Sequence, residues 1–421
     1  MIGIETKNKQ INDGYYHRNT CRICGGIHVE KFLSLGPIPL ANNLLEEDEV
    51  SNKEIYYPLD VFFCKDCHLV QLLDVVSPDL MFKNYVYMTG ASEPMQKHFS
   101  SLVEDSCRYI NRGKKGYVVD IGSNDGTLLQ IFSRHGFATL GVEPATNLVK
   151  ISESKGIRAI NAFFNTDTAH KVYQRHGAAD VITATNVFAH VDNLQDVLNG
   201  VNHLLSSEGI FIIEVPYLFH LINRLEFDTI YHEHLSYFSL ESLLFLFEKY
   251  GMTVVDVKQV STHGGSIRVF IKKGGKSSKN VLSLLKFEND EKINDFATYI
   301  KFGNDVSKLR QELIDLLKNL KKSGYRITGY GATAKGNTLL NYCNIGIEYL
   351  DYISDTTPLK QGKYTPGMHV PIVSEEQFHK NPPNYAILLA WNYADEILQK
   401  ETTYRKKGGK FILPIPRPTV I

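Results

Sequence analysis

The sequence predicts an α/β protein of 421 residues in three units, a small cysteine-containing region followed by two regions in which strands and helices alternate. Both Cys-x-x-Cys pairs lie within residues 1–82. Short apolar runs alternate with helical periods from about residue 116, and this alternation starts again after residue 324. Because such alternation is typical of doubly wound, mostly parallel sheets, we expect one sheet in residues 83–275 and another in residues 276–421.

Composition limits the classes of function. Lys and Arg together number 46, as do Asp and Glu, so the formal net charge is zero. A zero balance gives no overall attraction for nucleic acid or an anionic membrane, and an anionic ligand must be bound by a local site. No run approaches the roughly 18 apolar residues of a membrane span, and the first residues lack an apolar signal core. We expect a cytoplasmic protein that binds neither nucleic acid nor a membrane.

The N-terminal region holds four cysteines in two closely spaced pairs. They are Cys21 and Cys24 in CRIC, and Cys64 and Cys67 in CKDC. Thiolates three positions apart on a tight turn can bind one ion, and two such turns complete a tetrahedral all-sulfur zinc site without an open position. Two disulfides or a redox pair are the alternatives, although disulfides fit poorly in a reduced cytosol. His28 and His68 are rival ligands, but a surface position is the simpler interpretation for each. We predict a structural zinc ion.

The central region alternates strands and helices in order. Strands are expected at 117–122, 138–144, 178–191, 208–216, 252–260 and 266–273. Helices are expected at 126–136, 193–205 and 239–251. The last two strands have no helix between them, which predicts an antiparallel hairpin at the edge of the sheet.

The C-terminal region begins with a charged helical stretch, residues 276–322, that ends before Gly324. Further strands are expected at 325–331, 347–355, 385–391 and 409–414, with a helix from about residue 336. This pattern predicts a second α/β unit.

A glycine loop follows the first central strand. VVDIGSNDGTLL places Gly122, Asn124, Asp125 and Gly126 between a strand and a helix, where backbone amides can approach a ligand. The loop lacks the GxGxxG spacing of a pyrophosphate site, which favours a nucleoside without phosphates, such as S-adenosylmethionine (SAM). A plain glycine turn is the alternative.

Two later strands of this region end in polar residues that fit the same ligand. Glu143 ends the next strand, in GVEP, where a carboxylate can accept hydrogen bonds from both hydroxyls of a ribose. Asn186 and His190 lie in NVFAHV at the end of a later strand, where a polar residue commonly contacts adenosine or methionine. Together with the glycine loop, these residues predict a SAM site.

Aromatic and ionisable residues crowd into YHEHLSYFS. They are Tyr231, His232, Glu233, His234, Tyr237 and Phe238. Position 236 is serine, so the segment is not the HExxH zinc motif. A His–Glu pair suits general-base chemistry, in which the imidazole takes a proton and the carboxylate fixes its tautomer. Tyr85 and Tyr87 could add phenols to the same site. Packing at the end of the sheet is the alternative.

A second glycine loop, GYGATAKG, contains Gly329, Gly331, Lys335 and Gly336 between a strand and a helix. It approximates a dinucleotide loop, and Asp355 ends the next strand, so a dinucleotide fits. Lys335 at a helix N-terminus also suits a diphosphate. A structural glycine turn is again the alternative.

The motifs together resemble the C-methyltransferases of deoxysugar biosynthesis. The resemblance runs from about residue 21 to 415 and includes both cysteine pairs, VVDIGSNDGTLL, GVEP, YHEHLSYFS, GYGATAKG and SDTTPLKQGKYTPG. It implies methyl transfer from SAM to carbon 3 of a nucleotide-linked 4-keto-6-deoxysugar. It also implies a zinc-binding domain (1–82), a central class I (Rossmann-like, doubly wound) SAM methyltransferase domain (83–275) and a second Rossmann-like domain for the nucleotide-sugar (276–421).

The resemblance assigns roles to individual residues. It implies that His234 is a general base that forms an enolate, with Glu233, Tyr231 and Tyr85 as companions. Substrate contacts are expected from Lys335, Gly331 and Tyr237. The resemblance is compatible with a monomer or a weak homo-oligomer.

Three rival functions share parts of this pattern. A sugar-nucleotide O- or N-methyltransferase would use the same SAM site. A sugar-nucleotide oxidoreductase would use the loop at 329–336 for NAD. A non-catalytic scaffold would contact a partner through the zinc domain, but the SAM motifs speak against it.

Overall fold

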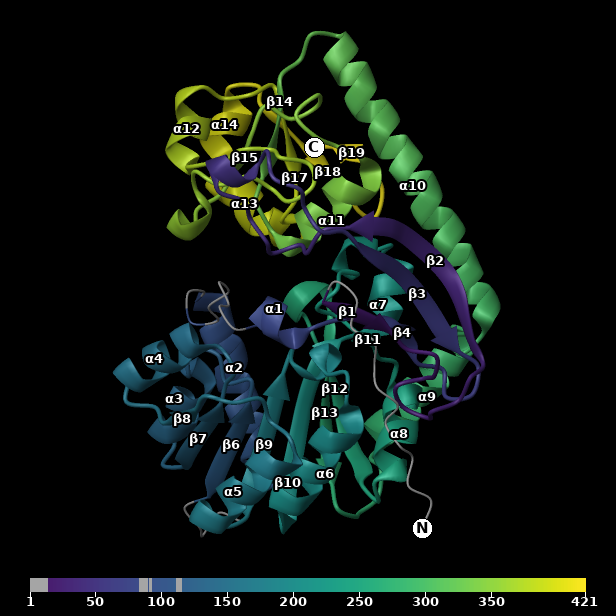
Figure 1. Ribbon diagram of the computed structural model, residues 1–421, viewed down its shortest axis with the longest axis vertical. Coiled ribbons are helices and arrows are strands. Elements are labelled where there is room, and N and C mark those ends of the chain that lie inside the picture. The colour runs from purple at the N-terminus through teal and green to yellow at the C-terminus, as the bar shows by residue number, and fades with distance from the viewer. Residues whose placement is uncertain (1–13, 83–89, 91–92, 111–115) are drawn as a thin grey trace.

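Figure 1 shows the chain as a computed structural model that describes residues 14–82, 90, 93–110 and 116–421. Its largest sheet has seven strands in the order β12-β13-β10-β9-β6-β7-β8. Their bounds are β6 Tyr117–Ile121, β7 Ala138–Val142, β8 Ala159–Ile160, β9 Ala179–Thr185, β10 Leu205–Pro216, β12 Thr253–Val260 and β13 Ser266–Lys272. Strands β8, β7, β6, β9 and β10 are parallel, which confirms the doubly wound sheet.

The predicted hairpin is also present. Strand β13 pairs antiparallel with both β12 and β10, so it lies inside the sheet and β12 forms the edge. The strand predicted over 178–191 ends earlier, because Asn186 adopts a positive φ of 56° and residues Phe188–His190 form a 3-10 turn.

Helices cover both faces of this sheet, and successive strand residues face opposite sides. Val119, Ile182 and Phe211 pack with helices α5, α6 and α8 on one face. Val118 and Val181 pack with α2 and α3 on the other. The helix bounds are α2 Glu93–Ser106, α3 Thr127–Arg134, α4 Thr146–Ser154, α5 Thr166–His176, α6 Leu194–Leu204, α7 Leu218–Asn223 and α8 Leu240–Lys249. Burial on both faces explains why these strands read as continuous apolar runs.

The cysteine-containing region forms a four-stranded antiparallel sheet in the order β11-β4-β3-β2. The strands are β2 Val29–Ile38, β3 Tyr57–Cys64, β4 Val70–Leu72 and β11 Ser236–Tyr237. A separate pair joins β1 Tyr15–His17 to β5 Asp74–Val76, ahead of the short helix α1 Pro78–Phe82. Strand β11 comes from YHEHLSYFS, so this segment completes the N-terminal sheet.

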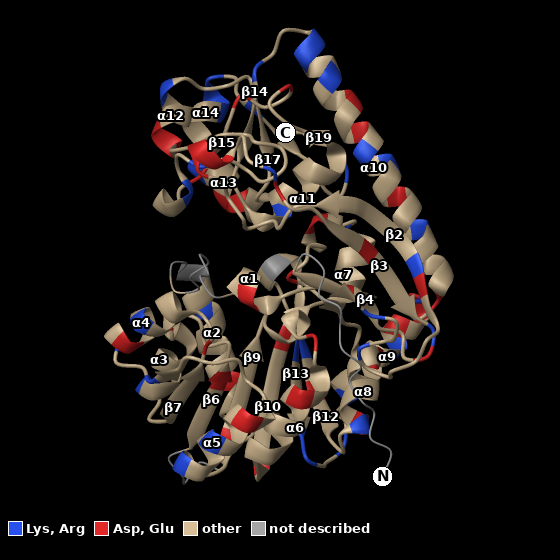
Figure 2. Ribbon diagram, in the orientation of Figure 1, with Lys and Arg blue, Asp and Glu red and all other residues tan. Residues whose placement is uncertain are grey.

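Two helices, α9 Lys279–Asp290 and α10 Phe296–Lys322, lead to the C-terminal sheet. Helix α10 runs along β2 (Figure 1), where Tyr299 and Phe302 pack on Phe32. Its buried residues recur every three or four positions, as an amphipathic helix requires. Basic and acidic side chains are interspersed along the remainder of the helix (Figure 2).

The C-terminal sheet has six strands in the order β16-β15-β14-β17-β18-β19, and only the β18–β19 pair is antiparallel. Its elements are β14 Ile327–Tyr330, α11 Ala334–Cys343, β15 Ile353–Ser354, β16 Ile372–Val373, α12 Glu375–Lys380, β17 Tyr385–Leu388, α13 Ala394–Lys400, α14 Thr402–Lys406, β18 Lys410–Leu413 and β19 Thr419–Val420. The second α/β unit is confirmed, although the strand predicted over 347–355 is reduced to its end. Within the described ranges, no helix combines the length and apolar character needed to cross a membrane.

Candidate active site and zinc centre

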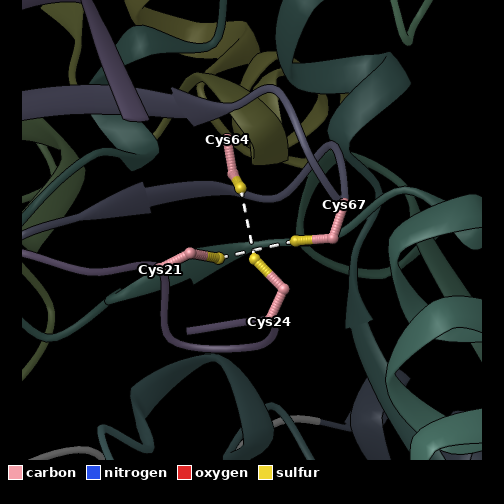
Figure 3. Close-up of side chains that lie close together, drawn as sticks. All are labelled: Cys21, Cys24, Cys64 and Cys67. Atoms are coloured by element: carbon pink, nitrogen blue, oxygen red, sulfur yellow. Dashed lines mark hydrogen bonds between the residues drawn. The ribbon is translucent and has the colours of Figure 1, made fainter. Parts of the chain in front are cut away.

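The four N-terminal cysteines converge on one point (Figure 3). Their sulfur atoms all lie within 4.8 Å of one another, with Cys21 and Cys67 3.4 Å apart and Cys24 and Cys64 3.5 Å apart. A tetrahedral zinc ion with Zn–S bonds of about 2.3 Å separates its sulfurs by about 3.8 Å, so the cluster fits zinc closely. The hydrogen bond to Cys21, together with burial, raises the pKa of the Cys64 thiol. A bound dication would offset the negative charge of four clustered thiolates.

Each Cys-x-x-Cys pair forms a tight turn, a zinc knuckle, that is closed by a backbone hydrogen bond. Gly25 N–H donates to Cys21 O (3.0 Å), and His68 N–H donates to Cys64 O (2.9 Å). The two histidines considered as rival ligands are paired elsewhere. His28 Nδ1 lies 3.0 Å from an Asp66 oxygen, and His68 Nδ1 lies 3.0 Å from a Glu241 oxygen. The all-cysteine set is therefore the one that the fold assembles.

The first glycine loop lies at the carboxyl ends of β6 and β7. Gly122 has φ 65°, and a Cβ there would lie 2.4 Å from Val187 Cγ2, so only glycine fits. The Glu143 carboxylate accepts hydrogen bonds from the backbone N–H groups of Asn124 (2.9 Å) and Ala145 (2.8 Å). Burial raises the pKa of Glu143. The loop and the carboxylate thus form one structure.

Two other predicted cofactor residues lie beside this loop in different settings. The Asp125 carboxylate is buried, where it pairs with Lys155 Nζ (2.7 Å) and accepts a hydrogen bond from the Thr127 hydroxyl (2.8 Å). These contacts brace the loop from within. Asn186 Oδ1, at the end of β9, is buried without a hydrogen-bond donor among the described residues. An orphaned acceptor at this position fits a bound ligand that donates a hydrogen bond.

His234 has a defined tautomer. Its Nδ1 lies 2.8 Å from the carbonyl oxygen of Thr229, which can only accept, so Nδ1 carries the hydrogen. Nε2 is therefore the basic nitrogen, and it accepts a hydrogen bond from the Tyr231 hydroxyl at 3.0 Å. We expected Glu233 to fix the tautomer, but a backbone carbonyl holds this hydrogen. The Glu233 carboxylate accepts a hydrogen bond from Asn42 Nδ2 (2.6 Å) instead.

The imidazole of His234 lies at the same end of the sheet as the glycine loop. Val187, which Gly122 faces, is three residues before His190, whose ring centroid is 5.0 Å from that of His234. His190 is stacked on Phe82 and is neutral, since burial lowers its pKa to about 4. The short segment after β9 therefore connects the two predicted sites.

Comparison with known proteins finds matches to three successive parts of the chain. Family models match for a zinc binding domain at residues 21–82, a methyltransferase domain at 95–257 and a C-methyltransferase C-terminal domain at 261–416. The C-methyltransferase NovU of Streptomyces niveus is 39% identical over 404 residues, which span 95% of this chain and 96% of NovU.

The chain belongs to the C-methyltransferase family. It is a SAM-dependent C-methyltransferase whose zinc-binding domain contains the four-cysteine cluster.

Solved methyltransferase structures cover less of the C-methyltransferase. A SAM-dependent methyltransferase from Clostridium acetobutylicum is 15% identical and covers 43% of this chain and 92% of its own, with a TM-score of 0.33. Magnesium protoporphyrin IX methyltransferase from Synechocystis, with bound SAM, is 13% identical and covers 42% and 79%, with a TM-score of 0.31.

The second glycine loop of the C-methyltransferase faces the segment that carries His234. Lys335, at the start of α11, places Nζ 4.9 Å from the ring centroid of Trp391. Trp391 Nε1 donates a hydrogen bond of 2.6 Å to Asp228, the residue before Thr229. Burial raises the pKa of Asp228. Sequence reasoning missed this Trp391–Asp228 link, because the two residues are 163 positions apart and no local pattern pairs them.

The remaining predicted residues have different surroundings. Gly331 has φ 88° and lies against Ala390. Asp355 accepts a hydrogen bond from Ala332 N–H (2.8 Å), so it braces the second glycine loop. Tyr237 is buried in β11, and its ring lies edge-on to that of His234 at 6.5 Å. Tyr85 and Tyr87 lie outside the described residues.

The SAM site of the C-methyltransferase can be tested at Glu143. We expect Glu143→Gln to weaken SAM binding roughly 10- to 100-fold, since a hydrogen bond to a charged group contributes about 1.5–3 kcal/mol. Calorimetric titration with SAM measures the change. Glu153→Gln, the same substitution at an exposed position of α4, is the matched control and should bind SAM as the wild type does. Equal affinities for the two variants would remove Glu143 from the ribose site.

Proposed function

We propose that the enzyme transfers the methyl group of SAM to carbon 3 of a nucleotide-linked 4-keto-6-deoxysugar, with His234 as the general base. One observation carries this proposal. The Thr229 carbonyl accepts the hydrogen on Nδ1 of His234, so Nε2 is the basic nitrogen, and the ring lies 5.0 Å from that of His190, in the segment that contacts the first glycine loop. The family membership supports C-methylation, and the sugar follows from the motif resemblance.

The proposed mechanism rests on one proton transfer. A ketone at carbon 4 makes the hydrogen on carbon 3 acidic, because its removal gives an enolate. Nε2 of His234 accepts that proton, and the Thr229 carbonyl then stabilises the imidazolium through Nδ1–H. The Tyr231 hydroxyl lies 3.0 Å from Nε2, and once Nε2 has taken the proton and can no longer accept, this hydroxyl would donate to the developing oxyanion instead. SAM supplies an electrophilic methyl group, and the protein positions the sugar carbon in line with it.

We also propose that the three regions divide the work. Residues 1–82 form the zinc domain, 83–275 the SAM domain and 276–421 the nucleotide-sugar domain. Strand β13, which ends at Lys272, belongs to the seven-stranded sheet and supports a boundary after it. Lys335 at the N-terminus of α11 suits a diphosphate, and Gly331 lets the chain turn beside it. Tyr237 would close the sugar side of the site.

A substrate panel tests the proposed reaction. We expect methyl transfer from isotopically labelled SAM to one or more nucleotide-linked 4-keto-6-deoxysugars, with the label on carbon 3 by NMR. The matched 4-hydroxy sugars should give no product, because their carbon 3 hydrogen is not acidic. A label on oxygen or nitrogen, or turnover of a 4-hydroxy sugar, would contradict the proposal.

A further inference from the structure

Arg22 lies between the first two zinc-centre cysteines, yet its side chain is completely buried. The planar guanidinium is a fork of donors that makes hydrogen bonds to several acceptors. Nη1 donates to the carbonyl of Leu235 (2.9 Å), and Nη2 donates to the carbonyl of Leu72 (3.0 Å). Nε donates to Asp192 Oδ1 (3.3 Å). A planar group with donors in fixed directions can satisfy these acceptors together, which a lysine ammonium cannot.

The first of these acceptors belongs to the residue that follows His234. The Leu235 carbonyl also accepts a hydrogen bond from Leu72 N–H (3.0 Å), and Leu235 N–H donates to the carbonyl of Ala189 (2.9 Å). Leu72 ends β4, the strand that follows the second cysteine pair. The residue between the first two cysteines and the strand after the second pair therefore both hold the carbonyl of Leu235, the residue that follows His234.

The third acceptor fixes the segment that packs on the same imidazole. Asp192 lies two residues after His190, and its carboxylate also accepts hydrogen bonds from Arg18 Nη1 (2.8 Å) and the Tyr16 hydroxyl. The Arg18 side chain is 20% exposed, whereas that of Arg22 is wholly enclosed. The two arginines thus share an anionic partner, but Arg22 is the one bonded to the Leu235 carbonyl.

We propose that Arg22 is a positioning residue that transmits the geometry of the zinc centre to His234. This inference rests on the proposed role of His234 as the base. The guanidinium fixes the Leu235 carbonyl and Asp192 at once, and so sets the direction in which Nε2 points. The zinc centre, closed to substrate, would then support catalysis through Arg22.

The test compares Arg22→Lys with Arg18→Lys. Both changes keep a cation near Asp192, but only Arg22→Lys removes the fork. We expect both variants to retain zinc and to bind SAM as the wild type does. Turnover should fall roughly 100-fold in Arg22→Lys, the scale of a 1 Å misplacement, with an unchanged KM for SAM, and should stay near the wild-type value in Arg18→Lys.

A second measurement reads His234 directly. Long-range ¹H–¹⁵N spectra of histidine-labelled enzyme, with His234 assigned by the His234→Asn variant, report its tautomer and protonation. We expect the Nδ1–H signature in the wild type and Arg18→Lys, and an altered signature in Arg22→Lys. If Arg22→Lys does not fold, Arg22→Gln takes its place, because its amide can still donate to one carbonyl.

The outcomes separate this inference from the proposed function. A His234 spectrum and a turnover in folded Arg22→Lys that match Arg18→Lys would overturn the inference. Failure of the proposed function would appear elsewhere, as retained proton exchange at carbon 3 in His234→Asn. In that case an altered His234 spectrum in Arg22→Lys would show that Arg22 positions His234. The position of His234 would then have no effect on catalysis.

Discussion

His234→Asn is expected to reduce turnover by roughly 10²- to 10⁴-fold, the usual contribution of a general base, while SAM binding stays intact. An asparagine amide can still donate to the Thr229 carbonyl, which keeps the local structure, but it has no basic nitrogen at the place of Nε2. Exchange of the carbon 3 hydrogen with deuterated water, measured by NMR without methyl transfer, isolates the step. This exchange should disappear in the variant.

The neighbouring His232 is the matched control. It is buried against the N-terminal sheet, with Nε2 3.2 Å from the carbonyl of Tyr57, and burial lowers its pKa to about 4. We expect His232→Asn to cost stability more than turnover, because this ring packs on β3 rather than on Tyr231 and His190. Deuterium exchange at the wild-type rate in His234→Asn would move the base to another residue.

Local sequence patterns predicted the elements whose contacts are local or repetitive. The apolar runs around Val119 and Ile212 identified strands buried on both faces, and the short link between β12 and β13 predicted their hairpin. The spacing of the four cysteines predicted their cluster, because two tight turns need few other contacts to present sulfur atoms to one ion. The positions of the glycine loop and Glu143 could also be predicted, since each directly follows a strand of the parallel sheet, whereas their contacts with SAM stay a prediction.

Contacts between distant segments could not be predicted in this way. Glu233 was expected to orient His234 because the two are adjacent, but the fold places Thr229 O on Nδ1 and Asn42 on the carboxylate. Arg22 reaches the Leu235 carbonyl across 213 residues of sequence, and periodicity carries no signal for such a pairing. The motifs identified the groups present in the site, whereas the tertiary packing decides which atoms they present to one another.

Removal of zinc should unfold the N-terminal sheet and abolish methyl transfer while SAM binding remains. Structural zinc sites bind with about 10–16 kcal/mol, comparable to the whole stability of a typical domain at about 5–15 kcal/mol. Strand β11 pairs with β4, so the segment that carries His234 loses its support with the metal. Glu143 and the glycine loop belong to the seven-stranded sheet and should keep their structure.

Cys67→Ser tests this expectation against Cys107→Ser, the same substitution outside the cluster. Zinc content by atomic emission, SAM affinity by calorimetry and hydrogen exchange of β4 and β11 should separate the two variants. We expect Cys67→Ser to lose the metal and the amide protection of both strands, with SAM affinity within about twofold of wild type. A metal-free enzyme with protected β11 amides and full turnover would show that the active-site segment is held without the zinc centre. Loss of SAM binding together with zinc would instead show that the two sheets fold as one unit. The seven-stranded sheet would then be unable to maintain the first glycine loop without the N-terminal sheet.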